Sequence, residues 1–174
     1  ALRSLYKNSD LIKSKYLGNC FTSSGINDFL YGRINKDIGY ISLNWFDQDI
    51  KKVEAEMVKI VRYLKECKSM IIDIRNNRGG TDSSALTVAN HFIKTDKCYQ
   101  ISRTRKTNTD YSYTDPKLWY TNHSNEVFSN PILILINRYT MSAAEAFSLA
   151  LKEQSHVSFI GEPTAGAFSD AEDA

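Results

Sequence analysis

Residues 69–80 contain the pattern that most restricts how this chain can fold. A short apolar run within residues 70–74 stops abruptly at polar residues, and the glycine pair Gly79–Gly80 follows. Such a run, bounded by turn residues, is typical of a buried strand. Because glycine has no side chain, the loop after this strand leaves backbone amides bare.

A second segment of the same design lies at residues 131–145. An apolar strand pattern over 131–137 leads into a turn that presents Ser142 at the start of a helical pattern. In open α/β sheets, sites gather in the loops at the carboxyl ends of neighbouring strands. We therefore expect Ser142 and the Gly79–Gly80 loop to share one cleft, as a serine nucleophile and an oxyanion hole do.

Strand and helix patterns alternate along the rest of the chain, which predicts an α/β layered fold with a largely parallel sheet flanked by helices. Apolar residues spaced by three and four predict a helix within residues 47–66, where Asp47 and Asp49 suit its capped N-terminus. The polar stretch 107–130 is expected to be a long surface excursion. The other expected elements are strands near 29–34, 38–44, 98–106 and 157–161, and helices over 83–93 and 142–153.

The chain of 174 residues is long enough for one domain with a substantial core. We divide it into a loop-rich leading segment or connector over residues 1–37 and a core over residues 38–174. The sequence begins without methionine and ends without a closing element, so we expect the core to be incomplete at both ends.

Composition excludes several functional classes. Hydrophobic residues at 42% and charged residues at 24% are those of an ordinary soluble globular protein. A net charge of +2 is too small to indicate binding of nucleic acid or of an anionic membrane. No apolar run is long enough to be a transmembrane segment. The three cysteines, Cys20, Cys67 and Cys98, lack the spacing of a metal site, and we interpret them as structural.

Ser142 admits two interpretations. The run Ser142-Ala-Ala-Glu145 fits an S-x-x-E capping box, which starts helices without any catalytic role and is favoured by the segment alone. A nucleophile would use the same position for another reason, since the helix dipole stabilises negative charge that develops there. The Ala143 amide would then point toward an oxyanion.

The residues of the segment 73–80 also admit more than one interpretation. Gly79–Gly80 fits a tight turn with positive φ, or a pair of amide donors, each such donor being worth about a hundred- to a thousandfold in rate. Asp73 is expected to be a structural hydrogen-bonding residue. Arg75 and Arg78 could bind a carboxylate, although solvated surface arginines are commoner.

The sequence offers no convincing general base for Ser142. His91 is expected on the surface of a helix, His123 in the polar excursion, and His156 at a turn before a strand. The sequence shows no convincing acidic partner for any of these histidines and no motif that indicates catalysis.

Four motifs in this order resemble the C-terminal-processing (tail-specific) serine protease family. They are Gly39-Tyr-Ile, Ile72-Asp-Ile-Arg-Asn-Asn-Arg-Gly-Gly80, Thr140-Met-Ser-Ala-Ala-Glu145 and Gly161-Glu-Pro-Thr-Ala-Gly166. The resemblance implies a crotonase/ClpP-like core, cleavage of peptide bonds near unstructured C-termini, and no metal or organic cofactor. It makes Ser142 the nucleophile and the amides of Ala143 and Gly80 the oxyanion hole, with Gly79 as the alternative donor.

One departure from the family pattern bears on the base. The branch with a serine–lysine dyad reads Thr-x-Gly-Lys, whereas here Thr164-Ala-Gly166 is followed by Ala167. The chain therefore resembles the other branch, that of the tricorn core protease and the repeats of interphotoreceptor retinoid-binding protein, whose proteases use a histidine supported by another serine and a glutamate. The histidine would lie upstream of Gly39 and the glutamate downstream of Ser169, so we expect the base and its orienting acid outside the given sequence.

The resemblance thus implies a serine endopeptidase with protein or peptide substrates. It also implies export, to the periplasm or as a cell-surface lipoprotein of a bacterium, and a possible PDZ domain elsewhere in the full-length protein. An alternative is a non-catalytic peptide- or ligand-binding module on the same fold. An acyl-CoA-handling crotonase is a third possibility that fits the motifs less well.

Overall fold

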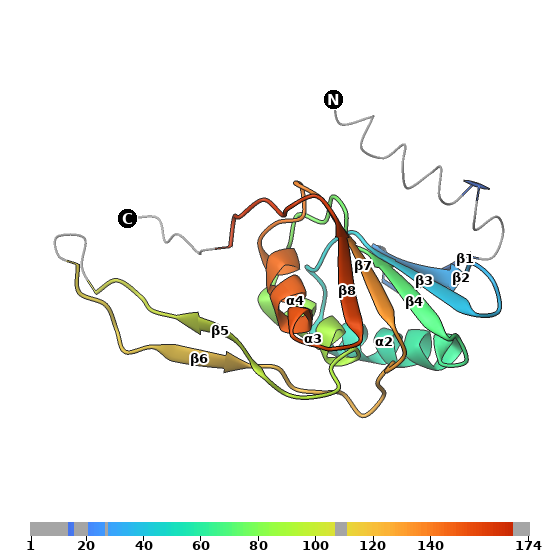
Figure 1. The fold of residues 1–174 in the computed structure, drawn as a ribbon, viewed down its shortest axis with the longest axis horizontal. Coiled ribbons are helices and arrows are strands. Elements are labelled where there is room, and N and C mark those ends of the chain that lie inside the picture. Colours follow the sequence, from blue (N-terminus) through green and yellow to red (C-terminus); the bar gives the residue numbers. More distant parts are fainter. Residues whose placement is uncertain (1–13, 16–20, 27, 107–110, 169–174) are drawn as a thin grey trace.

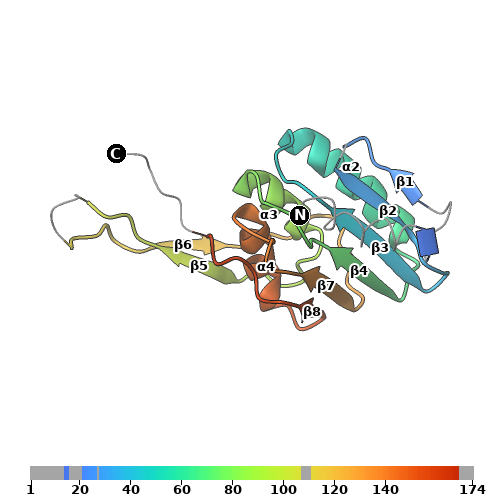
Figure 2. The same ribbon diagram turned by 90° about the horizontal axis from the view of Figure 1, so that it is seen from above.

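Six strands form one mixed sheet, and three helices lie side by side against one of its faces (Figures 1 and 2). The structure is a computed structural model that describes residues 14–15, 21–26, 28–106 and 111–168. In spatial order the strands are β1 (Phe21–Ser23), β2 (Phe29–Arg33), β3 (Ile38–Leu43), β4 (Ser69–Asp73), β7 (Ile132–Ile136) and β8 (Val157–Gly161).

The pairings from β3 through β8 are parallel, while β1–β2 and β2–β3 are antiparallel. The expectation of an α/β fold with a largely parallel sheet is confirmed. Because β2 pairs with β3, part of the leading segment before residue 38 belongs to the same sheet as the core. Cys20 and most of residues 1–20 lie outside the described residues, so their expected roles stay predictions.

The helices of the described residues are α2 (Ile50–Leu64), α3 (Asp82–Asn90) and α4 (Ala143–Lys152). As expected, Asp49 caps α2, its carboxylate accepting the Lys52 amide at 3.0 Å. The helices cover a row of fully buried isoleucines across the middle of the sheet, Ile41, Ile72 and Ile134, which are paired in register. Burial of each such side chain contributes about 1.5–3 kcal/mol. The continuous apolar runs of β4 and β7 thus reflect strands in the centre of the sheet.

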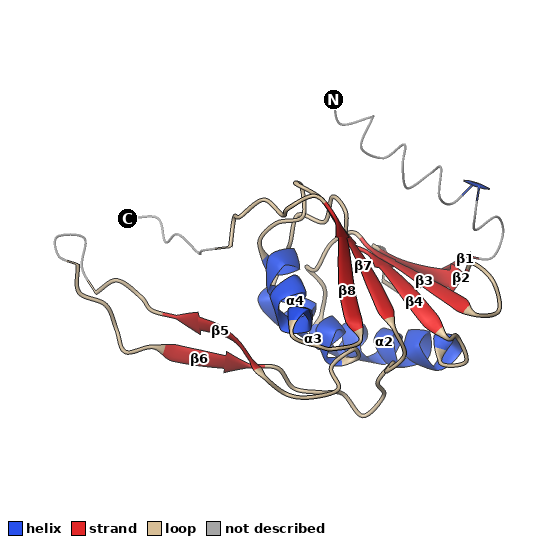
Figure 3. Cartoon of the chain, in the orientation of Figure 1, coloured by secondary structure: helices blue, strands red, loops and turns tan. Residues whose placement is uncertain are grey.

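The stretch 107–130 is more ordered than expected. Residues Lys117–Tyr120 form β6, which pairs antiparallel with β5 (Cys98–Ser102) as a separate hairpin that projects from the core (Figure 3). The surface excursion expected over 107–130 thus contains a strand that the sequence pattern did not predict, because an exposed strand needs no apolar face: Ile101 and Tyr120 are 65% and 63% exposed. Residues 107–110 lie outside the described part of the chain.

Candidate active site

The loops that follow β4 and β7 meet at the carboxyl ends of these strands. The Asn76 amide donates to the Asn137 side-chain oxygen at 3.0 Å, and the Asn137 side chain donates back to that of Asn76 at 2.9 Å. The Met141 amide donates to the Asn77 carbonyl oxygen at 3.1 Å. The Thr140 hydroxyl donates to the carbonyl oxygen at the end of β4, that of Ile74, at 3.0 Å. These bonds hold the two loops in one arrangement.

Gly79 lies directly against Ser142. A Cβ atom added to Gly79 would lie 2.7 Å from the Cβ of Ser142 and 2.9 Å from the Ala143 nitrogen, closer than such atoms can approach. Its φ of +100° also favours glycine. The structure therefore brings together the glycine loop and the serine that the sequence separates by more than sixty residues.

Gly80 packs against a third loop, the one between β3 and α2. An added Cβ would lie 2.4 Å from the carbonyl carbon of Phe46. The Phe46 amide donates to the Gly79 carbonyl oxygen at 2.8 Å, and the Thr81 amide donates to the Phe46 carbonyl oxygen at 3.0 Å. The glycine loop is thus fixed between Phe46 on one side and Ser142 on the other.

The two glycine amides differ in their hydrogen bonds. The Gly79 amide donates to the side-chain oxygen of Asn77 at 2.8 Å, and this fully buried side chain donates in turn to the Leu43 carbonyl oxygen at 3.0 Å. Within the described residues, the amides of Gly80 and Ala143 have no acceptor. Of the two glycines, Gly80 is therefore the one with a donor to offer a ligand.

Ser142 is exposed and has a strained backbone. Its φ of 55° and ψ of −128° lie in a region that costs a non-glycine residue about 1–3 kcal/mol. Its amide donates to the Ala167 carbonyl oxygen at 3.1 Å and to the Glu145 carboxylate at 3.0 Å. The capping box that the sequence predicts is present at the start of α4, with Ser142 at the N-cap and Glu145 at N3. The Ser142 residue is nevertheless exposed at the surface.

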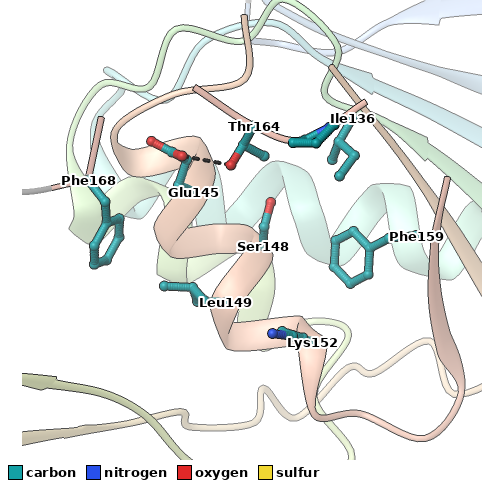
Figure 4. Close-up of a pocket in the computed structure, with 9 residues that line it drawn as sticks. Ile136, Glu145, Ser148, Leu149, Lys152, Phe159, Thr164 and Phe168 are labelled. Carbon is teal, nitrogen blue, oxygen red and sulfur yellow. Dashed lines mark hydrogen bonds between the residues drawn. The ribbon is translucent and has the colours of Figure 1, made fainter. Parts of the chain in front are cut away.

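Glu145 links the loop that carries Ser142 to the segment that follows β8. Its buried carboxylate accepts the Thr164 hydroxyl at 2.7 Å and the Gly166 amide at 2.8 Å, besides the Ser142 amide (Figure 4). Ala167, which stands where the serine–lysine branch has its lysine, is consequently next to Ser142.

Of the charged residues in and directly after β4, Asp73 and Arg75 pair with each other. The buried carboxylate of Asp73 accepts the Tyr40 hydroxyl at 2.8 Å and binds the Arg75 guanidinium at 2.6 Å, which agrees with a structural role. Burial, and then the charge of Asp73, raises the pKa of Tyr40 well above its ordinary value. Arg78 is exposed and has no side-chain partner among the described residues.

None of the three histidines adjoins Ser142. His91 is fully buried, with its ring nitrogens 2.8 Å from the Glu126 carbonyl oxygen and 3.1 Å from the Glu54 carboxylate, so the expectation of a surface position was wrong. Its helical spacing from buried Ser84 and Val88 could have indicated an inward position.

His123 and His156 are also accounted for elsewhere. His123 is exposed and pairs with Asp96. His156 precedes β8 at the amino-terminal ends of the strands, where its carbonyl oxygen accepts the Ile132 amide, and burial lowers its pKa. This is the end of the sheet opposite Ser142.

An apolar pocket of about 490 Å³ runs along α4 beyond Glu145, and Ser142 does not line it (Figure 4). Among the described residues, no group of histidine, cysteine and acidic side chains is arranged to hold a metal ion. The part of the chain that was described also contains no helix long and apolar enough to cross a membrane.

Comparison with known proteins agrees with this geometry. The model of peptidase family S41 matches residues 37–172. Over 132 residues the chain is 31% identical to the carboxy-terminal processing protease CtpA of Bacillus subtilis, covering 76% of this chain and 26% of that protein. Over 136 residues it is 28% identical to the chloroplastic carboxyl-terminal-processing peptidase 2 of Arabidopsis thaliana, covering 78% of this chain and 25% of that protein.

A solved structure is similar over most of the chain. A putative peptidase from Parabacteroides merdae superimposes with a TM-score of 0.80 at 25% identity, covering 91% of this chain and 50% of that one. The chain spans about a quarter of the length of the two processing proteases.

Proposed function

Because the chain belongs to peptidase family S41, we propose that it forms the core of a serine endopeptidase that cleaves protein or peptide substrates through an acyl-enzyme at Ser142. The amides of Gly80 and Ala143 form the oxyanion hole in this proposal. Gly79, the alternative donor, is the less suitable of the two glycines because its amide already donates to Asn77.

The observation that carries the proposal is the convergence of an exposed, strained serine with two unused backbone amides. Strained residues that the surrounding structure holds in place cluster at functional sites. Amide donors aimed at a developing oxyanion are typically worth about a hundred- to a thousandfold each in rate. A capping serine alone needs neither the strain nor the unused amides.

The general base is assigned outside residues 1–174, as the resemblance to the histidine-dependent branch implies. This assignment is supported by the positions of the three histidines, each of which lies away from Ser142. The same observation favours the second candidate, a binding module that keeps the cleft and lacks a working base. Export, lipoprotein anchoring, a PDZ domain in the full-length protein, and the division at residue 37 stay predictions from the resemblance and the sequence.

A fluorophosphonate probe separates the two candidates, since it labels only an activated serine. The intact protein should be labelled, and Ser142→Ala should lose both the label and peptide hydrolysis. Ser148→Ala, six residues further along the chain on α4, is the matched control and should keep the label. A folded wild-type protein that resists labelling would favour the binding module, and labelling that survives Ser142→Ala would refute the nucleophile.

A further inference from the structure

The arginines around the candidate site are not equivalent. Arg75 is bound by Asp73, with its Nη2 2.6 Å from Oδ2. Arg138, in the loop that leads to Ser142, is bound by Glu162, with its Nη2 2.7 Å from Oε1. Both guanidinium groups already have a carboxylate, so neither is free to select a ligand by charge.

Arg78 differs from both. It is exposed, and within the described residues its guanidinium makes no ion pair or hydrogen bond. It makes none with Asp47 either, although Asp47 lies on the neighbouring loop beside Gly80. An exposed arginine without a partner is common on any surface, so position must decide whether Arg78 has a role.

The position of Arg78 is set by the residues on both sides of it. Asn77 points into the core, where it binds the Leu43 carbonyl oxygen, and Gly79 presses against Ser142. Arg78 is therefore one residue from the contact with the serine and two from the unused Gly80 amide. The bonds of its neighbours hold its backbone, so the Arg78 side chain starts at the edge of the site.

On the basis of the proposed function, we propose that Arg78 is a specificity residue that binds a carboxylate of the substrate close to the scissile bond. An extended polypeptide advances about 3.3 Å per residue, so a side chain of this length reaches roughly two residues from the bond under attack. Arginine suits the role because its planar guanidinium binds carboxylates through paired hydrogen bonds. The carboxylate can belong to an aspartate or glutamate side chain or to a polypeptide C-terminus.

Two pairs of otherwise identical fluorogenic peptides test the proposal and distinguish these sources. One pair carries glutamate or glutamine two residues from the cleavage site, and the other ends in a free or an amidated carboxyl group. The readout is the acid-to-neutral ratio of kcat/KM for the intact protein. Wild type should prefer at least one acid by about two- to fivefold, the size expected of one exposed ion pair.

The variant Arg78→Gln should reduce that ratio to about one, and added salt should weaken the wild-type preference. Arg103→Gln is the matched control, because Arg103 is an exposed cation on the β5–β6 hairpin. It should keep the ratio. Arg78→Glu should reverse the preference toward a lysine-containing peptide, which mere structural damage would not do. Equal rates for both members of each pair in wild type, or a preference that survives in Arg78→Gln, would overturn the proposal.

Binding of the same labelled peptides to Ser142→Ala, measured by fluorescence anisotropy, gives the ratio without hydrolysis. If no peptide is cleaved by wild type, the proposed function fails, while the ratio of Kd values still decides the role of Arg78. If peptides are cleaved without regard to charge, only the role of Arg78 fails.

Discussion

The two loops at the candidate site and the β5–β6 hairpin are both polar in sequence, yet the structure holds them in opposite ways. In the loops, Asn77 and Thr140 are fully buried and bind strand-end carbonyl oxygens. On the hairpin, Ile101 and Tyr120 are largely exposed, and the contacts are local ones, such as Lys117 lying 3.7 Å from the centre of the Trp119 ring.

The loops are therefore held in place by buried polar contacts with the core, whereas the hairpin is not. A buried polar group without its partner costs about 1–3 kcal/mol, so each loop side chain admits one arrangement. An exposed side chain on the hairpin stays in contact with water in whichever rotamer it adopts. Substitutions should therefore have large effects in the loops and small ones on the hairpin.

The largest effect is expected for Gly79→Ala. Its new Cβ would overlap Ser142 and Ala143, and its φ of +100° would add a strain of about 1–3 kcal/mol. We expect a loss of more than about 3 kcal/mol in the free energy of unfolding and loss of fluorophosphonate labelling. Urea titration measures the first.

Gly166→Ala is the control for this substitution, because Gly166 has a φ of +72° and no atom within 4 Å of an added Cβ. It should show the conformational cost alone, about 1 kcal/mol. Equal losses in the two variants would mean that contact with Ser142 does not constrain Gly79.

Glu145→Gln should have the next largest effect. Three donors converge on this buried carboxylate, and an amide offers them only one acceptor oxygen and no charge. We expect a loss of about 2 kcal/mol in unfolding free energy, as for a hydrogen bond to a charged group, and slower labelling of Ser142. Glu66→Gln, at an exposed position after α2, should stay within about 0.5 kcal/mol of wild type. A similarly small change in Glu145→Gln would show that the carboxylate does not hold the loop.

A smaller effect separates Ser142→Gly from Ser142→Ala. Glycine accepts a φ of 55° without strain, whereas alanine keeps the strain of the serine. Ser142→Gly should be the more stable of the two by about 1 kcal/mol in thermal or urea unfolding, while neither is labelled. The opposite order would mean that the backbone at Ser142 is relaxed in solution.

The smallest effect is expected on the hairpin. Ile101→Thr keeps the β-branched shape of an exposed strand residue and should change the unfolding free energy by no more than about 0.5 kcal/mol. The same substitution at fully buried Ile134 leaves an unpaired hydroxyl in the core and should cost at least about 2 kcal/mol. A large loss in Ile101→Thr would show that the hairpin contributes to the core.

The sequence predicted the central strands and their convergent loops because buried strands can be recognised there as apolar runs. β4 and β7 are continuous apolar runs, and the loops after them follow from the geometry of parallel strands. β6 was not predicted, because Lys117–Tyr120 is only four residues long and mostly exposed, so its apolar residues do not mark a buried face.

Two features of the structure depend on contacts that local sequence does not encode. The difference between Gly79 and Gly80 follows from the orientation of Asn77, which a carbonyl oxygen 34 residues away holds in place. The hydrogen-bond partners of buried His91, Glu54 and the Glu126 carbonyl oxygen, lie 37 and 35 residues away along the chain. A pattern read along the chain contains neither partner.

The Ser142 amide donates to two acceptors at once, and this constrains the length of the connection after β8. One acceptor, the Ala167 carbonyl oxygen, is reached only if the chain between Gly161 and Ala167 has its present length. Inserting or deleting a single residue would displace that oxygen by up to about 3.3 Å, beyond the reach of a hydrogen bond. This stretch should therefore tolerate a substitution at an exposed position such as Ala165 better than a change in its length.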